Sequence, residues 1–156
     1  MITQQELQDK FKYVDGKLFW KKCQKISLIG TRAGTKQNKG YRVINMAKRS
    51  YVEHQIIFML HHGYIPEQVD HINGIKDDNR IENLRAATNS KNQWNVCRTK
   101  KTQTGVKGVR RLGKKYQARI SVDSKMIYLG TYSTLELATI AIQSARKIYH
   151  GEYARD

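Results

Sequence analysis

Asp70 and His71 form the neighbouring pair best suited to chemistry in this 156-residue chain. Successive side chains of an extended strand point to opposite faces, so a carboxylate and an imidazole in this order can serve separate tasks. A carboxylate binds hard cations, and a neutral imidazole accepts a proton near pH 7. Asparagines, whose amide oxygens also suit Mg²⁺ or Mn²⁺, follow at Asn79, Asn83, Asn89, Asn92 and Asn95. Taken singly, the pair is compatible with an ordinary surface pair, and the asparagines with turns and helix caps.

Other metal-binding patterns are weaker. The chain has two cysteines, Cys23 and Cys97, and no CxxC, so a four-thiolate zinc site is excluded and any metal ligands are oxygen and nitrogen groups. His54, His61 and His62 accompany an apolar helical stretch without cysteines or carboxylates at matching spacing. We therefore interpret these histidines as structural.

The charge of the chain indicates a polyanionic partner. Lys and Arg number 29 against 13 Asp and Glu, which gives a net charge of +16 and a pI near 10.0. Such an excess favours nucleic acid first and an anionic membrane surface second. No apolar run reaches the roughly 18–20 residues of a membrane span, and residues 1–6 lack a basic-then-apolar signal pattern. We therefore expect a cytoplasmic protein with no membrane partner.

Short helices, hairpins and strands are predicted around the Asp70-His71 pair. A capping box at Thr3 and Glu6 predicts a first helix, and Asp15-Gly16 between two apolar runs predicts a hairpin with a type I′ turn. Strands are predicted over 41–46 and 51–52, followed by a helix over 54–62 that Gly63 ends. Residues 69–74 run as a strand into an Asn-Gly turn, residues 81–85 return as a strand or turn, and a polar helix extends from Thr88 to about Val96.

The last fifty residues predict a second unit. Residues 98–104 contain no apolar residue and are interpreted as a basic linker. Three strands follow, over 105–112, 116–122 and 126–129, and Ser133 with Glu136 forms a capping box for a helix that ends at Gly151. Three antiparallel strands and one packed helix make a complete small α+β unit.

The segment around the pair resembles the core of HNH endonucleases, most closely the phage and intron-encoded homing type. The resemblance rests on the ordered strings Val69–Gly74 and Asp78–Arg85, and it covers residues 41–96, including Val52-Glu53-His54 and the helix after it. It implies a ββα-metal fold that holds one divalent ion, Mg²⁺ or Mn²⁺, and hydrolyses DNA phosphodiester bonds.

The resemblance also implies individual roles. Asp70 corresponds to the metal-binding acid and His71 to the general base that deprotonates water. Asn83 corresponds to the central asparagine, which holds the loop and orients the histidine. The third position, 21 residues after His71, is Asn92, where many members have histidine and a phage homing subset has asparagine. Asn92 is then the second metal ligand, with Asn89 and Asn95 as competing assignments.

Two arginines near the pair are candidate DNA contacts. Arg80 or Arg85 would meet a phosphate beside the scissile bond, and a surface arginine of a basic protein is an equal alternative.

Residues 104–154 resemble an AP2 DNA-binding domain. The resemblance rests on Thr104–Arg111, Tyr116–Ile120 and Tyr128–Tyr132, with Tyr116 where the family has tryptophan. It implies that one sheet face enters the major groove of double-stranded DNA. The predicted DNA-binding residues of this unit are Arg110, Arg111, Lys114, Gln117, Arg119 and Lys125. The alternative is a solvated basic face.

Together these features predict an α+β protein of two modules: a ββα-metal HNH nuclease over residues 1–97 and an AP2-like unit over 105–156. The predicted activity is metal-dependent DNA cleavage by a phage-encoded, homing-endonuclease-like protein in a bacterial host, acting as a monomer that nicks or as a pair that cuts both strands. The alternatives are a DNA-binding regulator with an inactive nuclease site and a binder of structured RNA.

Overall fold

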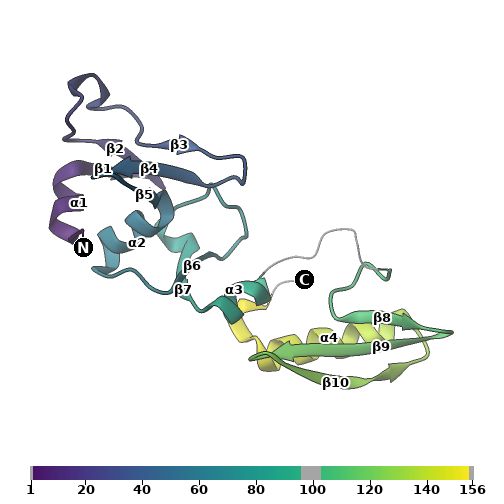
Figure 1. The fold of residues 1–156 in the computed structure, drawn as a ribbon. Helices are drawn as coiled ribbons and strands as arrows, with labels where there is room; N and C mark the ends of the chain where they lie inside the picture. Colours follow the sequence, from purple (N-terminus) through teal and green to yellow (C-terminus); the bar gives the residue numbers. More distant parts are fainter. Residues whose placement is uncertain (1, 96–102, 155–156) are drawn as a thin grey trace. The chain divides into compact units, whose positions relative to one another are not determined.

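Two compact units, Met1–Ala87 and Thr88–Asp156, make up the computed structural model (Figure 1). It describes residues 2–95 and 103–154. Each unit combines helices with small antiparallel sheets, which confirms the predicted mixed α+β class. Cys97 and residues 98–102 of the predicted linker lie outside the described residues.

The first unit begins with a helix and a hairpin. Helix α1 (Gln4–Lys10) is closed by the predicted capping box, in which the Thr3 hydroxyl accepts from the Glu6 N–H at 3.2 Å and the Glu6 carboxylate accepts from the Thr3 N–H at 2.8 Å. Strands β1 (Phe11–Val14) and β2 (Lys17–Trp20) then pair antiparallel. Asp15 and Gly16 both have positive φ, at 43° and 73°, as the predicted type I′ turn requires.

A three-stranded sheet and a helix complete the core of this unit. Strands β3 (Thr35–Lys36), β4 (Arg42–Met46) and β5 (Arg49–Val52) lie in that order, and a 3-10 helix (Ile26–Leu28) lies in the preceding loop. Helix α2 (Glu53–His62) follows β5 directly and ends at Gly63, whose φ of 79° is left-handed, as predicted. Its apolar side chains pack in one core with those of α1, the hairpin and β4: Leu7, Phe11, Leu18, Ile44, Ile56, Ile57 and Phe58.

Strand β6 (Gln68–His71) carries the Asp70-His71 pair and pairs with β7 (Leu84–Ala87). The segment between them turns at Gly74 and ends in a short 3-10 helix (Ile81–Asn83). The first hairpin supports this segment, because the Tyr13 hydroxyl accepts a hydrogen bond from the Ile81 N–H at 3.1 Å. A Cβ at Gly16 would lie 2.7 Å from the Arg80 backbone nitrogen, so turn and segment are in close contact.

The second unit has one sheet and one long helix. Strands β8 (Val109–Leu112), β9 (Lys115–Val122) and β10 (Lys125–Tyr132) form an antiparallel sheet in the order β10-β9-β8, with a bulge between Tyr128 and Gly130. Helix α4 (Leu135–Tyr149) packs on one face, and a 3-10 helix (Gly151–Tyr153) follows it. Buried residues from the sheet and the helix make the core: Val109, Ala118, Ile120, Ala138, Ile142 and Ala145.

Helix α3 (Asn89–Asn95) also belongs to the second unit. The Trp94 ring stacks on the His150 ring with centroids 4.3 Å apart, and the Lys107 ammonium donates to the Trp94 carbonyl at 2.9 Å. The units therefore divide after Ala87, whereas the sequence predicted a module boundary after residue 97. The sequence of α3 has no apolar stripe that would indicate where the helix packs. In the structure, the Trp94–His150 stack joins it to the C-terminal end of α4.

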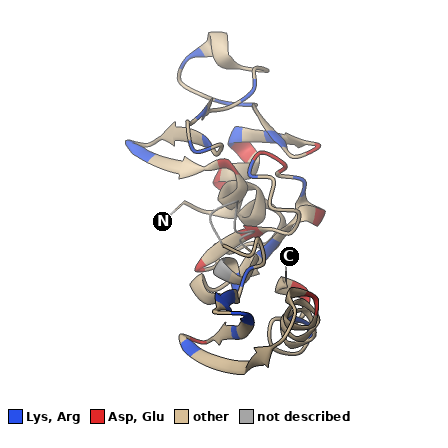
Figure 2. Ribbon diagram, turned by 90° about the vertical axis from the view of Figure 1, so that its right-hand side faces the viewer, with Lys and Arg blue, Asp and Glu red and all other residues tan. Residues whose placement is uncertain are grey.

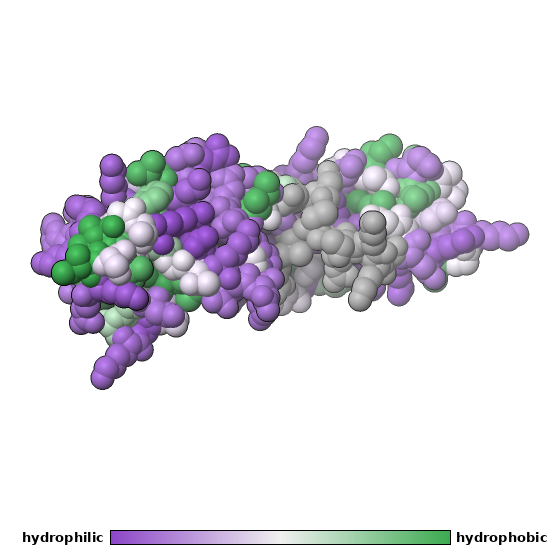
Figure 3. Space-filling view, turned by 90° about the horizontal axis from the view of Figure 1, so that it is seen from above, coloured by the Kyte–Doolittle hydropathy of each residue, from purple (hydrophilic) through white to green (hydrophobic). Residues whose placement is uncertain are grey.

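The surface is mostly polar. Lys and Arg residues are spread over both units (Figure 2), and the face seen in Figure 3 is largely hydrophilic, with apolar side chains in small separate patches. Over residues 2–95 and 103–154, no helix has the length and apolar character needed to cross a membrane.

The contact between the hairpin turn and the β6–β7 segment gives a stability prediction. Gly16→Ala adds a Cβ against backbone at positive φ, whereas Gly30→Ala adds one at φ 79° with nothing within 4 Å. Both variants incur the strain of a left-handed residue, about 1–2 kcal/mol. Gly16→Ala should lose about a further 1–3 kcal/mol in urea unfolding, because the neighbouring backbone must move. Equal losses in the two variants would show that the contact contributes nothing.

Candidate functional site

Asp70 and His71 are both buried, with only 4% and 5% of their surfaces exposed. Strand β6 holds them in register with β7, where Asp70 faces Arg85 and His71 faces Leu84. Burial of a carboxylate and an imidazole requires polar partners, because an unpaired buried charge is costly. The structure supplies a different partner for each.

Asp70 is paired with Arg85. The Arg85 Nε and Nη2 atoms both lie 2.9 Å from the Asp70 Oδ2 atom, and the Arg85 side chain is 12% exposed. The pairing follows from the β6–β7 register, which the sequence alone did not reveal. A phosphate contact by Arg85, as predicted from the sequence, would require this ion pair to open.

His71 is connected to a buried carboxylate through one asparagine. The His71 Nε2 atom lies 2.8 Å from the Asn79 Oδ1 atom, and the Asn79 amide donates to Glu53 Oε2 at 3.0 Å. Glu53 is fully buried and Asn79 is 1% exposed. Sequence reasoning named Asn79 only as one of several possible oxygen ligands and gave Glu53 no role of its own, although both lie within the stretch that resembles HNH endonucleases.

Glu53 collects donors from several segments. Its Oε1 atom accepts from the Leu18 N–H at 3.1 Å, and its Oε2 atom lies 3.5 Å from Arg32 Nη2 and 3.8 Å from Arg42 Nε. Burial raises the pKa of the Glu53 carboxyl, while the Leu18 N–H and the two guanidinium groups act in the opposite direction. Burial is the largest of these effects, and the donors that face both oxygens offset it only in part.

The imidazole of His71 is kept neutral. Burial lowers its pKa, and the Asn79 hydrogen bond and the Asp70 carboxylate oppose that shift only in part. A neutral ring at physiological pH is the form that can accept a proton.

His54 lies beside His71. The two rings are 5.0 Å apart and perpendicular, and Tyr41 packs edge-on against His54 at 5.4 Å. Burial, with a smaller contribution from His71, lowers the pKa of His54 to about 3, and its buried Nδ1 atom has no hydrogen-bond partner among the described residues. His54 therefore forms part of the wall around His71, and the structural role predicted for it stays a prediction.

Asn83 shapes the segment between β6 and β7. Its amide oxygen accepts from the Asn73 N–H at 3.0 Å, and its amide nitrogen donates to Asn73 Oδ1 at 3.0 Å and to the Asp78 carbonyl at 2.7 Å. These bonds close the segment on itself. The ring of His71 is contacted by Asn79, whereas Asn83 binds the backbone and side chain of the loop.

Arg80 lies on the outer side of this loop, half exposed. Its Nε and Nη2 atoms each donate to one Asp78 oxygen at 2.8 Å. This bidentate pair holds the pKa of the Asp78 carboxyl well below its usual range. The exposed side of the guanidinium is available for the phosphate contact predicted from the sequence.

The two residues predicted to bind a metal differ in their surroundings. The carboxylate of Asp70 and the amide oxygen of Asn92 are each of a type that Mg²⁺ and Mn²⁺ accept. Asn92 is half-buried on α3, in the second unit, where Asn95 is buried and Asn89 is exposed. Across the described residues, no group of three or more His, Cys, Asp and Glu side chains gathers around one point. A metal bound by Asp70 would therefore depend on amides or water for its other ligands.

The sheet of the second unit divides the predicted DNA-binding residues between its faces. Arg110 pairs with Gln117, and Arg119 follows two positions later, so these three share the face opposite α4. Arg111 pairs with Tyr116, and Lys125 with Val122, so these two cations belong to the helix-covered side at its edges. Lys114 lies in the β8–β9 turn. The prediction of a single shared face was wrong for Arg111 and Lys125, because strand residues alternate with a period of two.

The open face also carries residues that sequence reasoning missed. Tyr128 pairs with Arg119 and Met126 with Ser121, and both side chains are well exposed. Their alternation with the partly buried Ile127 was the available signal. The Arg110 Nε donates to Gln117 Oε1 at 2.7 Å, which orders this part of the face.

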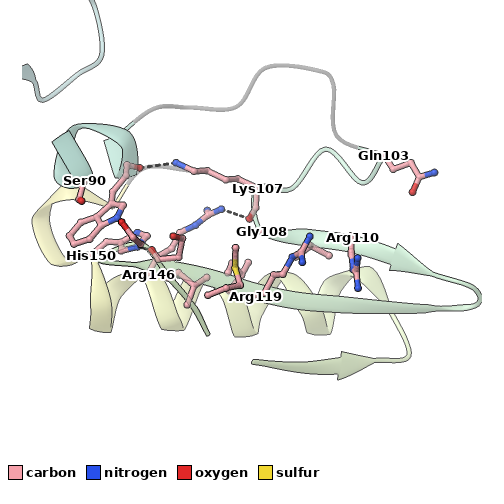
Figure 4. Close-up of a pocket in the computed structure, with 15 residues that line it drawn as sticks. Ser90, Gln103, Lys107, Gly108, Arg110, Arg119, Arg146 and His150 are labelled. Carbon is pink, nitrogen blue, oxygen red and sulfur yellow. Dashed lines mark hydrogen bonds between the residues drawn. The ribbon is translucent and has the colours of Figure 1, made fainter. Parts of the chain in front are cut away.

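A hollow of about 760 Å³ lies next to this face. Figure 4 shows Arg110 and Arg119 at one end and Lys107, Arg146 and His150 at the other. Arg146 donates to the Lys107 carbonyl and His150 contacts the Ser121 carbonyl at 2.9 Å, so two of these groups brace its walls.

One family model and one phage protein are similar to parts of this chain. Residues 51–94 match the family model described as HNH endonuclease, which supports an HNH nuclease in this segment. The chain is 25% identical over 121 residues to Protein 3.8 of Escherichia phage T7, an alignment that covers 75% of this chain and 97% of that protein. No solved structure matches the chain. The family match ends before the β8–β10 sheet, whose AP2 resemblance stays a prediction.

The buried ring of His54 predicts a pH dependence of stability. Its pKa is about 3 in the folded chain and about 6.5 when unfolded, so its contribution is present above pH 6.5 and lost as pH falls toward 3. Each pH unit in that range should cost about 1.4 kcal/mol. In urea unfolding, His54→Leu should show a shallower loss of stability below pH 6.5 than the wild type. Identical slopes would mean that His54 takes up its proton without unfolding.

Proposed function

We propose that this protein is a metal-dependent DNA endonuclease of the HNH type, and that its second unit supplies affinity for double-stranded DNA. The observation that carries the proposal is His71, a buried and neutral imidazole next to Asp70, within the segment that matches HNH endonucleases. The phage relative supports a phage-encoded protein. Action on DNA in a bacterial host, as by a homing enzyme, is part of the proposal.

His71 is assigned the proton transfer in this proposal. Hydrolysis of a phosphodiester needs a water molecule that loses its proton as it attacks phosphorus, and a neutral imidazole is suited to accept that proton. Asn83 keeps the segment after β6 in shape, so that the ring is presented from a rigid strand. Arg80, half exposed on the same segment, would contact a phosphate of the bound strand.

Asp70 and Asn92 are assigned to the metal by the family resemblance. A bound Mg²⁺ or Mn²⁺ would stabilise the negative charge on the scissile phosphate and on the leaving oxygen. Arg85, paired with Asp70, would hold that carboxylate in place.

A DNA-binding regulator without cleavage activity is the second candidate. The observation that favours it is the Asp70–Arg85 ion pair, because a guanidinium already neutralises the carboxylate assigned to the metal. Both candidates require DNA binding, so cleavage decides between them.

The cleavage prediction uses supercoiled plasmid and phage DNA with Mg²⁺, Mn²⁺ or EDTA. The wild type should convert plasmid to nicked or linear forms with either metal and not with EDTA. His71→Ala should abolish cleavage while gel-shift binding survives, because the base is lost and the DNA contacts are not. His62→Ala, on the exposed last turn of α2, should cut like the wild type.

Two results would contradict this assignment. Unchanged cleavage by His71→Ala would show that another group takes the proton. Binding without cleavage by the wild type in both metals would favour the regulator.

The sheet face predicts a difference between two arginines of the second unit. Arg119 lies on the open face and Arg111 on the opposite side, so Arg119→Ala should cost about 1–3 kcal/mol of specific affinity, and Arg111→Ala less. Affinity is measured for a duplex selected from a random library, in competition with unselected DNA. A uniform loss on all sequences would make Arg119 a phosphate contact, and an equal loss in both variants would contradict the role of the face.

A further inference from the structure

We propose that Glu53 and Asn79 are positioning residues that fix the tautomer of His71, so that its Nδ1 atom is the proton acceptor. The inference rests on the proposed function, because it concerns the base of that reaction. It follows from a series of hydrogen bonds through Glu53, Asn79 and His71. In this series, each residue determines whether the next one donates or accepts.

The chain begins at the Glu53 carboxylate. Both of its oxygens face donors: Oε1 faces the Leu18 N–H, and Oε2 faces the Asn79 amide with Arg32 and Arg42 close by. A proton on Oε2 would be directed into a group of guanidinium and amide N–H groups. Glu53 is therefore an acceptor, and an ionised carboxylate has no donor to offer.

Asn79 transmits this constraint. A side-chain amide donates through nitrogen and accepts through oxygen, so a nitrogen committed to Glu53 leaves the oxygen directed at His71. The Asn79 side chain is almost completely buried, and water does not offer the amide an alternative orientation. The reversed amide would place its oxygen against the Glu53 carboxylate.

The series of hydrogen bonds ends at the imidazole of His71. An acceptor oxygen 2.8 Å from Nε2 requires a hydrogen on Nε2, and the neutral imidazole then carries its lone pair on Nδ1. The opposite tautomer would have two lone pairs facing each other at Nε2 and a hydrogen on Nδ1. The perpendicular ring of His54, 5.0 Å away, limits rotation of the imidazole out of this geometry.

The segments that hold this chain are remote in sequence. Leu18 is 35 residues from Glu53, and Asn79 is 26 residues from it. The hairpin that supplies the Leu18 N–H also contacts the backbone at Asn79 and Arg80 through Gly16. The first hairpin, which contains none of the predicted catalytic residues, therefore contributes to the protonation pattern of His71.

The test reads the tautomer directly. The full-length protein with ¹⁵N-labelled histidine is studied by NMR without DNA or metal at about pH 8, above the ordinary histidine pKa. In the wild type, His71 should show a protonated Nε2 and an unprotonated Nδ1. Glu53→Gln introduces an amide that can donate as well as accept, so Asn79 can reverse, and His71 should lose its single tautomer.

Activity gives a second readout. Glu53→Gln should lower the rate of plasmid cleavage at saturating DNA by about 10- to 100-fold, with DNA affinity unchanged. Glu136→Gln makes the same charge change on the exposed first turn of α4, and should leave tautomer and rate as in the wild type. If Glu53→Gln does not fold, Asn79→Ala removes the acceptor from the ring and leaves the other donors of Glu53 in place, with the same expected loss.

The outcomes separate this inference from the proposed function. A wild-type His71 protonated on Nδ1 would overturn the inference even if the protein cuts DNA. A variant that keeps the wild-type tautomer and rate would overturn it as well. A protein that shows the expected tautomer and its loss in the variants, but cuts no DNA, would contradict the proposed function and leave the hydrogen-bond chain established.

Discussion

The buried carboxylate of Glu53 is the interaction on which the first unit depends. A carboxylate with no exposed surface is costly unless every oxygen has donors. Glu53 lies at the start of α2, and its donors come from β2, from the loop before β3, from β4 and from the segment after β6. The hydrogen bonds and ion pairs of the Glu53 carboxylate therefore hold four segments of the chain around the start of α2. An apolar residue there would pack, but it would select none of these partners.

The candidate site inherits its geometry from that arrangement. His71 extends from a strand, but its orientation is determined by Asn79, which is held by Glu53 and by the hairpin turn behind it. Asn83 closes the same segment through Asn73 and the Asp78 carbonyl. Asn83 therefore holds the loop, whereas Asn79 contacts the ring of His71. A buried, neutral imidazole next to a carboxylate–guanidinium pair is the result.

The second unit follows a simpler rule. Its strands alternate between a helix-covered side and an open side, so basic residues adjacent in sequence are separated in space. Arg110 and Arg119 lie together on the open side with Tyr128, while Arg111 lies opposite. Helix α3, which carries Asn92, packs in this unit through the Trp94–His150 stack. The residue predicted to complete a metal site thus folds with the proposed DNA-binding sheet.

The sequence by itself determined the local features of the backbone. The capping box at Thr3, the type I′ turn at Asp15-Gly16 and the end of α2 at Gly63 depend on residues a few positions apart, whose preferences for backbone angles decide the outcome. The mixed α+β class and the HNH segment were also readable, because strand and helix periods and an ordered string of polar residues persist in any context. These local features are enough to place Asp70 and His71 on a strand.

Only the tertiary structure decided which polar groups meet. The Asp70–Arg85 pair depends on a strand register, and the Glu53–Asn79–His71 chain joins residues 26 and 8 positions apart. His54 looked like an ordinary helix residue, and Glu53 had no role of its own, because their partners come from elsewhere in the chain. The physical reason is that a hydrogen bond or ion pair gains its importance from burial, and burial is a property of the assembled core. Local spacing specifies the elements, whereas the exclusion of water around them selects the contacts that give His71 its chemistry.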